Sequence, residues 1–142
     1  QSSVRHGGFC GGVEHFDHPA FGIASAEARM MDPQQRLLME GAYAALRSAQ
    51  QRRQDLSGSL TGVFVGIIAF EHAHMLAVSP ASCSVYASTS SEASIASGRL
   101  SYALGLHGPC VSYDTACSAA LVACHAGLRA LQLDDKATFM KF

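Results

Sequence analysis

An uninterrupted apolar run, Thr61 to Ile68, restricts the folds open to this chain more than any other feature. Its Val, Phe and Ile side chains follow one another without the polar alternation of a half-exposed strand. Such a run is typical of a strand in a parallel sheet that helices cover on both faces. We therefore expect a buried strand here and a fold of the α/β class.

A helix is expected to precede this strand. Asp32 suits the N-cap, Pro33 suits the first helical position, and Gln35 is placed to complete a capping box. The helix is expected to continue to about Ala49 with one apolar face. The residues expected on that face are Leu38, Ala42, Ala45, Leu46 and Ala49.

A second helix is expected after the strand, from Ser90 to Ala103. Thr89 and Glu92 have the spacing of a capping box, and Gly105 fits the C-terminal cap. The segment Glu71 to His74, which lies between the strand and this helix, is expected to form a loop.

The stretch after Gly108-Pro109 changes from strand to helix. Cys110 to Asp114 suits a short strand, and Ser118 to Gln132 is rich in Ala and Leu, which favour helix. The order of elements is then strand, helix, strand, helix. This order predicts parallel strands joined by right-handed crossovers.

Cys117 lies where this strand ends and the helix begins. Backbone N–H groups at a helix N-terminus are unpaired and carry partial positive charge, which favours thiolate over thiol. Because thiolate is the attacking form, Cys117 is a candidate nucleophile. The alternative is a small buried cysteine in a tight turn, since buried cysteines are common.

Several further motifs occur in a consistent order between Val4 and Leu133. They are Val4–Phe9, Phe16–Asp17, Phe21–Ile23, Met31–Glu40, Thr61–Gly66, Ser97–Tyr102, Gly105–Pro109 and Asp114–Ala123. Together they resemble the β-ketoacyl synthases, the condensing enzymes of polyketide and fatty-acid synthesis. The resemblance is closest to the polyketide-type enzymes, although Ala119 and Ala120 stand where those commonly carry serines.

The resemblance implies a partial thiolase-like fold, a mixed and mainly parallel sheet with packed helices. The chain would hold most of the first of two similar halves. Residues 1–133 would form the partial N-terminal ketosynthase domain, and residues 134–142 would be a divergent C-terminal tail.

The resemblance also implies a chemistry. Cys117 would accept the acyl chain from an acyl carrier protein, with its own backbone N–H as an oxyanion donor, before decarboxylative Claisen condensation with a malonyl-type thioester. The family takes two catalytic histidines and a lysine from the second half. His125 lies about 12 Å further along the same helix at about 1.5 Å per residue. We therefore expect that this chain alone does not complete the condensation, and we expect no cofactor and no metal.

Other polar residues have weaker patterns. His72 and His74, with Glu71 beside them, would bind zinc only if a third ligand folded close; otherwise they are simply exposed. Arg36 and Glu40 have the spacing of a helical ion pair. Three residues are expected to be solvated: His6, His15 and His18. Two more are expected to have structural roles in the turn: Asp114 and Ser118.

Charge is sparse, at 15% of residues against about 25% in typical globular proteins. Between Leu56 and Gly98 only Glu71 and Glu92 are charged. We expect something to cover this stretch: the rest of a larger fold, a second copy of the chain, or other subunits. A catalytically inactive structural subunit of a larger assembly is therefore an alternative function.

Bulk properties exclude some further classes. The formal net charge of −1 suggests no nucleic-acid partner, and the run Val63 to Phe70 is too short to span a bilayer. The 142 residues allow one domain at most. Five cysteines without paired spacing favour a reducing intracellular compartment, either cytoplasmic or organellar with plastids included, over secretion. The family resemblance adds a homodimer as an expected state.

Overall fold

The computed structural model describes residues 6–8, 11–68, 71–79, 83–133 and 139–141. In this part of the chain three strands form one sheet in the order β2-β1-β3. The strands are β1 (Gly62–Gly66), β2 (Cys110–Tyr113) and β3 (Phe139–Lys141), and both pairings are parallel. The expected buried strand and the parallel pairing with the strand before Cys117 are confirmed.

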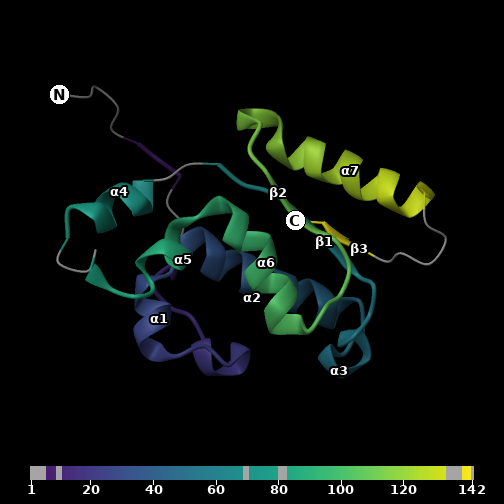
Figure 1. The fold of residues 1–142 in the computed structure, drawn as a ribbon, viewed down its shortest axis with the longest axis horizontal. Coiled ribbons are helices and arrows are strands. Elements are labelled where there is room, and N and C mark those ends of the chain that lie inside the picture. The colour runs from purple at the N-terminus through teal and green to yellow at the C-terminus, as the bar shows by residue number, and fades with distance from the viewer. Residues whose placement is uncertain (1–5, 9–10, 69–70, 80–82, 134–138, 142) are drawn as a thin grey trace.

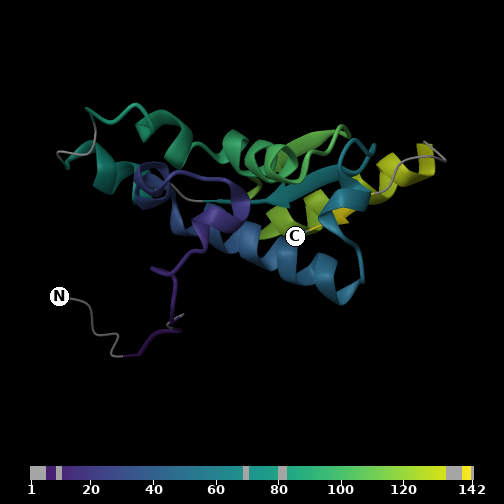
Figure 2. The same ribbon diagram turned by 90° about the horizontal axis from the view of Figure 1, so that it is seen from below.

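Helices cover both faces of this sheet (Figure 1). Helix α7 packs on one face, and α6 with α2 packs on the other. The short helices α1, α4 and α5 lie around one end of α2 and α6, on the same side as the N-terminal segment, whereas α3 lies at the opposite end (Figure 1 and Figure 2). The α-helices are α1 (Ser25–Met30), α2 (Pro33–Ser48), α3 (Arg53–Leu56), α4 (Glu71–Ala77), α5 (Ala87–Ser91), α6 (Ala93–Leu104) and α7 (Ala119–Leu133), and the 3₁₀ turns are η1 (His18–Phe21) and η3 (Ala116–Ser118).

Strand β1 is buried on both faces, as its sequence requires. Val63 and Val65 belong to the core formed with α2 and α6, whereas Phe64, also buried, lies outside that cluster. Gly66 faces the first turn of α7. Because side chains alternate along a strand, an apolar run without alternation is what a doubly covered strand needs.

Helix α2 begins where the sequence predicts, but its capping box does not form. The Asp32 carboxylate accepts a hydrogen bond from the Gln34 N–H at 2.7 Å, which confirms the N-cap. The Asp32 N–H donates instead to the Ser90 carbonyl at 2.9 Å. Gln35 is 2% exposed and its amide reaches Thr89 and Glu92 carbonyls. The Asp32 N–H and the Gln35 side chain, which would bond to each other in a capping box, therefore bond to residues distant in the sequence.

The buried face of α2 is also rotated from the expected one. Ala45 and Ala49 are exposed, and Leu38 is only partly buried. The buried positions are Gln35, Met39, Ala42 and Leu46. The prediction was wrong about Ala45 and Ala49 because the buried Gln35 and Met39 shift the contact stripe by part of a turn.

The helix expected from Ser90 to Ala103 is two helices, α5 and α6. Glu92 between them is extended, with φ −76° and ψ 128°. The expected capping box is therefore wrong: Thr89 lies inside α5, where its hydroxyl donates to the Tyr86 carbonyl at 3.3 Å. Gly105 is left-handed, with φ 69°, and its N–H donates to carbonyls of the last turn, so the predicted C-terminal cap is confirmed.

The segment Glu71 to His74 is helical, not a loop, because it opens α4. The His72 Nε2–H donates to the Met30 carbonyl at 2.8 Å and so ties α4 to α1. Ala, Met and Leu extend the segment, and their helical preference outweighs the two histidines.

The two ends of the chain show different outcomes. Phe21 is buried and stacks on Phe16 with 5.4 Å between ring centroids, so these two aromatics anchor the N-terminal segment as expected. Phe9, expected to join them, lies outside the described residues. Strand β3 falls within the tail 134–142 and pairs with Gly62 to Phe64 of β1.

Candidate active site

The candidate nucleophile lies in a tight turn between β2 and α7. The chain leaves β2 at Tyr113, passes through Asp114 and Thr115, and enters η3 before α7 begins. Ala116 has a left-handed backbone with φ 53°. A side chain in this region costs about 1–2 kcal/mol, so the turn is strained immediately before Cys117.

Hydrogen bonds of Asp114 and Ser118 hold this turn. The Asp114 carboxylate accepts from the Ala116 N–H at 3.3 Å. The Ser118 hydroxyl donates to the Thr115 carbonyl at 2.7 Å, and the Ser118 N–H donates to the same oxygen at 3.2 Å. Asp114 and Ser118 therefore act on the backbone, which agrees with their expected structural roles.

Cys117 itself is open to a substrate. Its side chain is exposed, so the alternative of a buried cysteine in a turn does not describe it. Within the described residues its backbone N–H has no hydrogen-bond partner. It also precedes the first turn of a 15-residue helix. A thiol and a free N–H at a positive helix end are the two features that an acyl-accepting cysteine needs.

Gly66 explains how the helix comes so near the sheet. A Cβ placed on Gly66 would lie 2.4 Å from the Ala120 nitrogen and 2.5 Å from the Ala119 carbonyl carbon. These are backbone atoms, which cannot move aside without moving α7. The sequence alone gave no prediction for Gly66; a glycine ending a buried strand beside a helix start is the signal that indicates such a contact.

The other described cysteines do not form a site with Cys117. Cys83 and Cys110 are exposed, Cys124 is half-buried on α7, and all four described cysteines are free. His125 is exposed on α7 beyond Cys117. Among the described residues no His, Cys, Asp or Glu joins His72 and His74 in a group suited to a metal.

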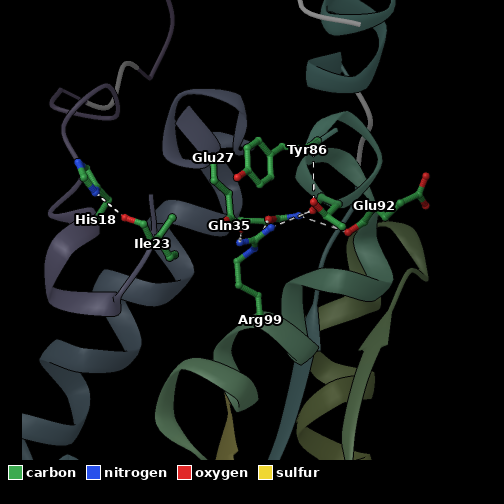
Figure 3. A network of polar contacts seen from close by, with 8 residues as sticks. His18, Ile23, Glu27, Gln35, Tyr86, Glu92 and Arg99 are labelled. Atoms are coloured by element: carbon green, nitrogen blue, oxygen red, sulfur yellow. Dashed lines mark hydrogen bonds and ion pairs between the residues drawn. The ribbon is translucent and has the colours of Figure 1, made fainter. Parts of the chain in front are cut away.

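A buried polar network fixes α6. The Arg99 side chain is 9% exposed and forms an ion pair with Glu27, and it donates to the Gln35 amide oxygen at 3.0 Å (Figure 3). It also donates to the Thr89 carbonyl at 3.2 Å. Four helices meet at this one guanidinium: α1, α2, α5 and α6.

Helix α6 then holds β2, the strand that leads to Cys117. The Ser112 hydroxyl donates to the Ser97 hydroxyl at 2.9 Å. Arg99 was not singled out from the sequence. A single cationic side chain on a helix whose other residues are mostly apolar or small is the sequence signal that indicates a buried ion pair.

Helix α7 leaves much of its apolar surface uncovered. It touches the sheet through Ala119, Ala123 and Gly127, whereas Leu121 is 74% exposed and Leu133 is 79% exposed. The segment Ala116–Leu133 is the one described helix whose length and composition would let it cross a membrane, a property shared by core helices of soluble proteins.

Comparisons with known proteins agree with this geometry. Residues 1–139 match the family described as "Beta-ketoacyl synthase, N-terminal domain". The spectinabilin polyketide synthase system protein NorC of Streptomyces orinoci is 45% identical over 132 residues, which are 93% of this chain and 6% of that protein. Polyketide synthase GfsB of Streptomyces halstedii is 44% identical over 131 residues, which are 92% of this chain and 2% of that protein.

Solved structures give the same result. The ketosynthase from module 6 of the bacillaene synthase of Bacillus subtilis 168 superposes with a TM-score of 0.79 at 33% identity, over 92% of this chain and 21% of that one. The oxazolomycin ketosynthase domain OzmH KS7 of Streptomyces albus JA3453 gives 0.78 at 35% identity, over 89% and 22%. The chain thus spans 21% and 22% of these two structures, and 6% and 2% of the two curated relatives.

The fold class expected from the sequence is confirmed, since the solved neighbours are ketosynthases with the thiolase-like architecture. The family also places its ketosynthases within larger multidomain assemblies. This chain therefore belongs to the β-ketoacyl synthase family, and it corresponds to the N-terminal part of a polyketide-type ketosynthase domain.

Proposed function

We propose that Cys117 is the acyl-accepting nucleophile of a polyketide-type ketosynthase. One observation carries the proposal. An exposed thiol follows a left-handed Ala116 at a strand-to-helix turn, and the backbone N–H of the same cysteine is unpaired within the described residues. An exposed sulfur with an unpaired backbone donor beside it supports this role.

The first step is transfer of the acyl group. The Cys117 thiolate attacks the carbonyl carbon of an acyl thioester, a new carbon–sulfur bond forms, the donor's carbon–sulfur bond breaks, and the donor sulfur leaves as a thiolate. The negative charge on the carbonyl oxygen in the transition state is stabilised by the Cys117 N–H and by the positive end of α7. Removing one such donor in other enzymes costs about 10²–10³ in kcat, which indicates the scale of this effect.

The second step is attack on this thioester by the carbanion left when a malonyl-type extender loses carbon dioxide. A carbon–carbon bond forms, the bond between the acyl carbon and the Cys117 sulfur breaks, and Cys117 is released as a thiolate. The histidines that stabilise this step in the family have no counterpart in the described site. His125 is exposed and lies on α7 itself, on a different turn of the helix from Cys117. We propose that other parts of the assembly supply these groups.

The partners follow from this chemistry. The acyl donor and the extender are thioesters carried by an acyl carrier protein, and the enzyme works in a reducing intracellular compartment, where the thiol of Cys117 stays free. A second copy of the chain is proposed to pair with it, because β2 has β1 on one side only in the described sheet.

The test is acylation of the natural polypeptide that carries this sequence. It is incubated with a short acyl pantetheine thioester, digested, and mapped by mass spectrometry. We expect the acyl mass on the peptide containing Cys117. The Cys117→Ala variant should lose this adduct, whereas Cys110→Ala, a matched exposed cysteine seven residues earlier, should keep it. An adduct that survives in Cys117→Ala contradicts the proposal.

A structural role within a larger assembly is the second candidate function, because several large apolar side chains are exposed. They include Val78 at 88%, Val85 at 84% and Tyr102 at 90%. If this is the function, Cys117→Ala leaves both assembly and biological activity unchanged. Loss of biological activity with intact assembly in that variant excludes the structural function.

A further inference from the structure

A small cavity lies between η1, α1 and the first turns of α2, on a part of the molecule that the acyl chemistry does not use. Its volume is about 220 Å³, and its charged lining consists of Arg29, Arg36 and Glu14. His18 and Ser25 contribute further polar groups. Since a water molecule occupies about 30 Å³ of liquid, the cavity has room for a ligand of several heavy atoms.

One nitrogen of the Arg36 guanidinium has no acceptor in the part of the chain that the structure describes. This nitrogen is Nε, which is buried and has no hydrogen-bond partner there. Within the described part of the chain Arg36 forms no ion pair, so the helical pair expected with Glu40 is wrong. A buried guanidinium N–H without an acceptor is costly, which makes an acceptor from outside favourable.

Arg29 brings a second cation to the same cavity. Like Arg36, it makes no ion pair or side-chain hydrogen bond within the described residues. It lies on α1, whereas Arg36 lies on α2, so the two guanidinium groups approach the cavity from different helices.

The nearby acidic groups do not neutralise these two arginines. Among the described residues of the lining Glu14 is the single carboxylate, so these residues carry an excess of positive charge. The Glu14 Oε1 lies 3.6 Å from His15 Nε2. The carboxylate of Asp32, one turn before Arg36, accepts from the Gln34 N–H. The His18 Nδ1–H donates to the Ile23 carbonyl at 2.6 Å, which fixes the imidazole (Figure 3).

We propose that this cavity is a binding site for a compact oxyanion, a phosphate or carboxylate group held between Arg29 and Arg36. Guanidinium groups suit such ligands, because their planar N–H donors match two oxygens of one anion. The anion is either a free small molecule or the side-chain carboxylate of an acidic peptide segment. The site stands apart from Cys117, and its test does not depend on acylation.

The experiment is calorimetric titration of the natural polypeptide with inorganic phosphate at constant ionic strength. A short glutamate-rich peptide is titrated in parallel. Arg29→Gln and Arg36→Gln should each weaken binding of the stronger probe at least 10-fold. Arg47→Gln, an exposed arginine further along α2, is the matched control and should leave binding unchanged.

The two probes separate the two sources of the anion. Arginine-dependent binding of phosphate supports a free anion, and arginine-dependent binding of the peptide alone supports an acidic segment. Should Arg36→Gln not fold, Arg36→Lys keeps the charge but removes the buried Nε, and Arg29→Gln tests the site from the exposed side. Absence of binding by both probes, or binding equally insensitive to all three arginines, overturns the proposal.

Discussion

Ala116 is the residue on which the shape of the nucleophile turn depends most. Its φ of 53° is the conformation in which glycine is unstrained and a side chain is not. The turn nevertheless carries alanine. The Asp114 carboxylate accepts a hydrogen bond from the backbone, and the Ser118 hydroxyl donates one to it, which holds the neighbouring backbone in place. A strained residue beside an exposed thiol is a combination that occurs at functional sites.

This leads to a prediction for two variants of Ala116. Ala116→Val should lower the free energy of unfolding by about 1–3 kcal/mol, because a β-branched side chain is a genuine outlier at positive φ. Ala116→Gly should change it by less than about 1 kcal/mol, since relief of strain is offset by greater freedom of the unfolded chain. Urea denaturation measures both, and equal stability of the valine variant would show that the turn is unstrained.

The end of strand β1 at Gly66 lies directly against the first turn of helix α7. The backbone of Ala119 and Ala120 occupies the space that a Cβ on Gly66 would need. Strand β1 and helix α7 are therefore held at a separation that only glycine permits, and Cys117 is carried on that helix start.

Gly66→Ala is expected to push the start of α7 away from the sheet. Overpacking of this kind costs about 1–3 kcal/mol. The acylation rate of Cys117 should fall more than stability does, because the helix start positions the sulfur and the N–H together. Gly41→Ala on α2, where a Cβ meets nothing within 4 Å, is the control. An unchanged acylation rate in Gly66→Ala would argue against this positioning.

The hydrogen-bond and ion-pair network around Arg99 joins four helices, and its contribution to stability can be tested by substitution. Removing one partner of a buried ion pair costs about 3–5 kcal/mol, because the other charge is left unpaired. Arg99→Met should approach this loss because Glu27 remains, with a 23% exposed side chain. Arg99→Met combined with Glu27→Leu should recover part of it. Thermal denaturation of the two variants checks the expected order.

At the level of elements, sequence patterns were informative where the local signal and the tertiary contact agree. The buried strand β1, the N-cap Asp32 and the cap Gly105 were predicted for this reason. The break at Glu92 and the burial of Gln35 were not predicted, because they depend on hydrogen bonds from the Gln35 amide to the carbonyls of Thr89 and Glu92. Hydrogen bonds between residues more than fifty positions apart produce no periodic pattern of apolar and polar residues that a sequence analysis could detect.

The candidate site follows the same division. Cys117 was identified from its motif and its position between a strand and a helix, both of which are local. The left-handed Ala116, the contact of Gly66 with α7 and the link from Arg99 through α6 to β2 were not predicted. They arise only when the sheet and the two helical layers are assembled.

For the whole molecule, the exposed apolar side chains matter most. Leu121 on α7 and Val85 before α5 are more than 70% exposed, although the chain is poor in charge. Large exposed apolar surfaces mark interaction sites. They fit a domain whose remaining part, or whose partners, cover these faces.

Leu121→Glu tests this covering in the natural polypeptide. If α7 is covered there, the buried carboxylate should lower the free energy of unfolding by more than about 2 kcal/mol. Substitution at a side chain that stays exposed changes stability by no more than about 0.5 kcal/mol. Gln132→Glu, which adds the same charge at an exposed polar position of α7, is the control. A neutral effect of Leu121→Glu would show that this face is open to water.

The most direct test of the central claim compares the cysteines within one molecule. Cys83, Cys110 and Cys117 are all exposed, so access alone predicts similar rates of alkylation. The natural polypeptide is treated with limiting iodoacetamide, and each site is quantified by mass spectrometry over time, in buffer and in urea. An activated Cys117 should react at least 10-fold faster than the other two in buffer and equally fast in urea. Equal rates in the folded protein would contradict an activated nucleophile at this turn.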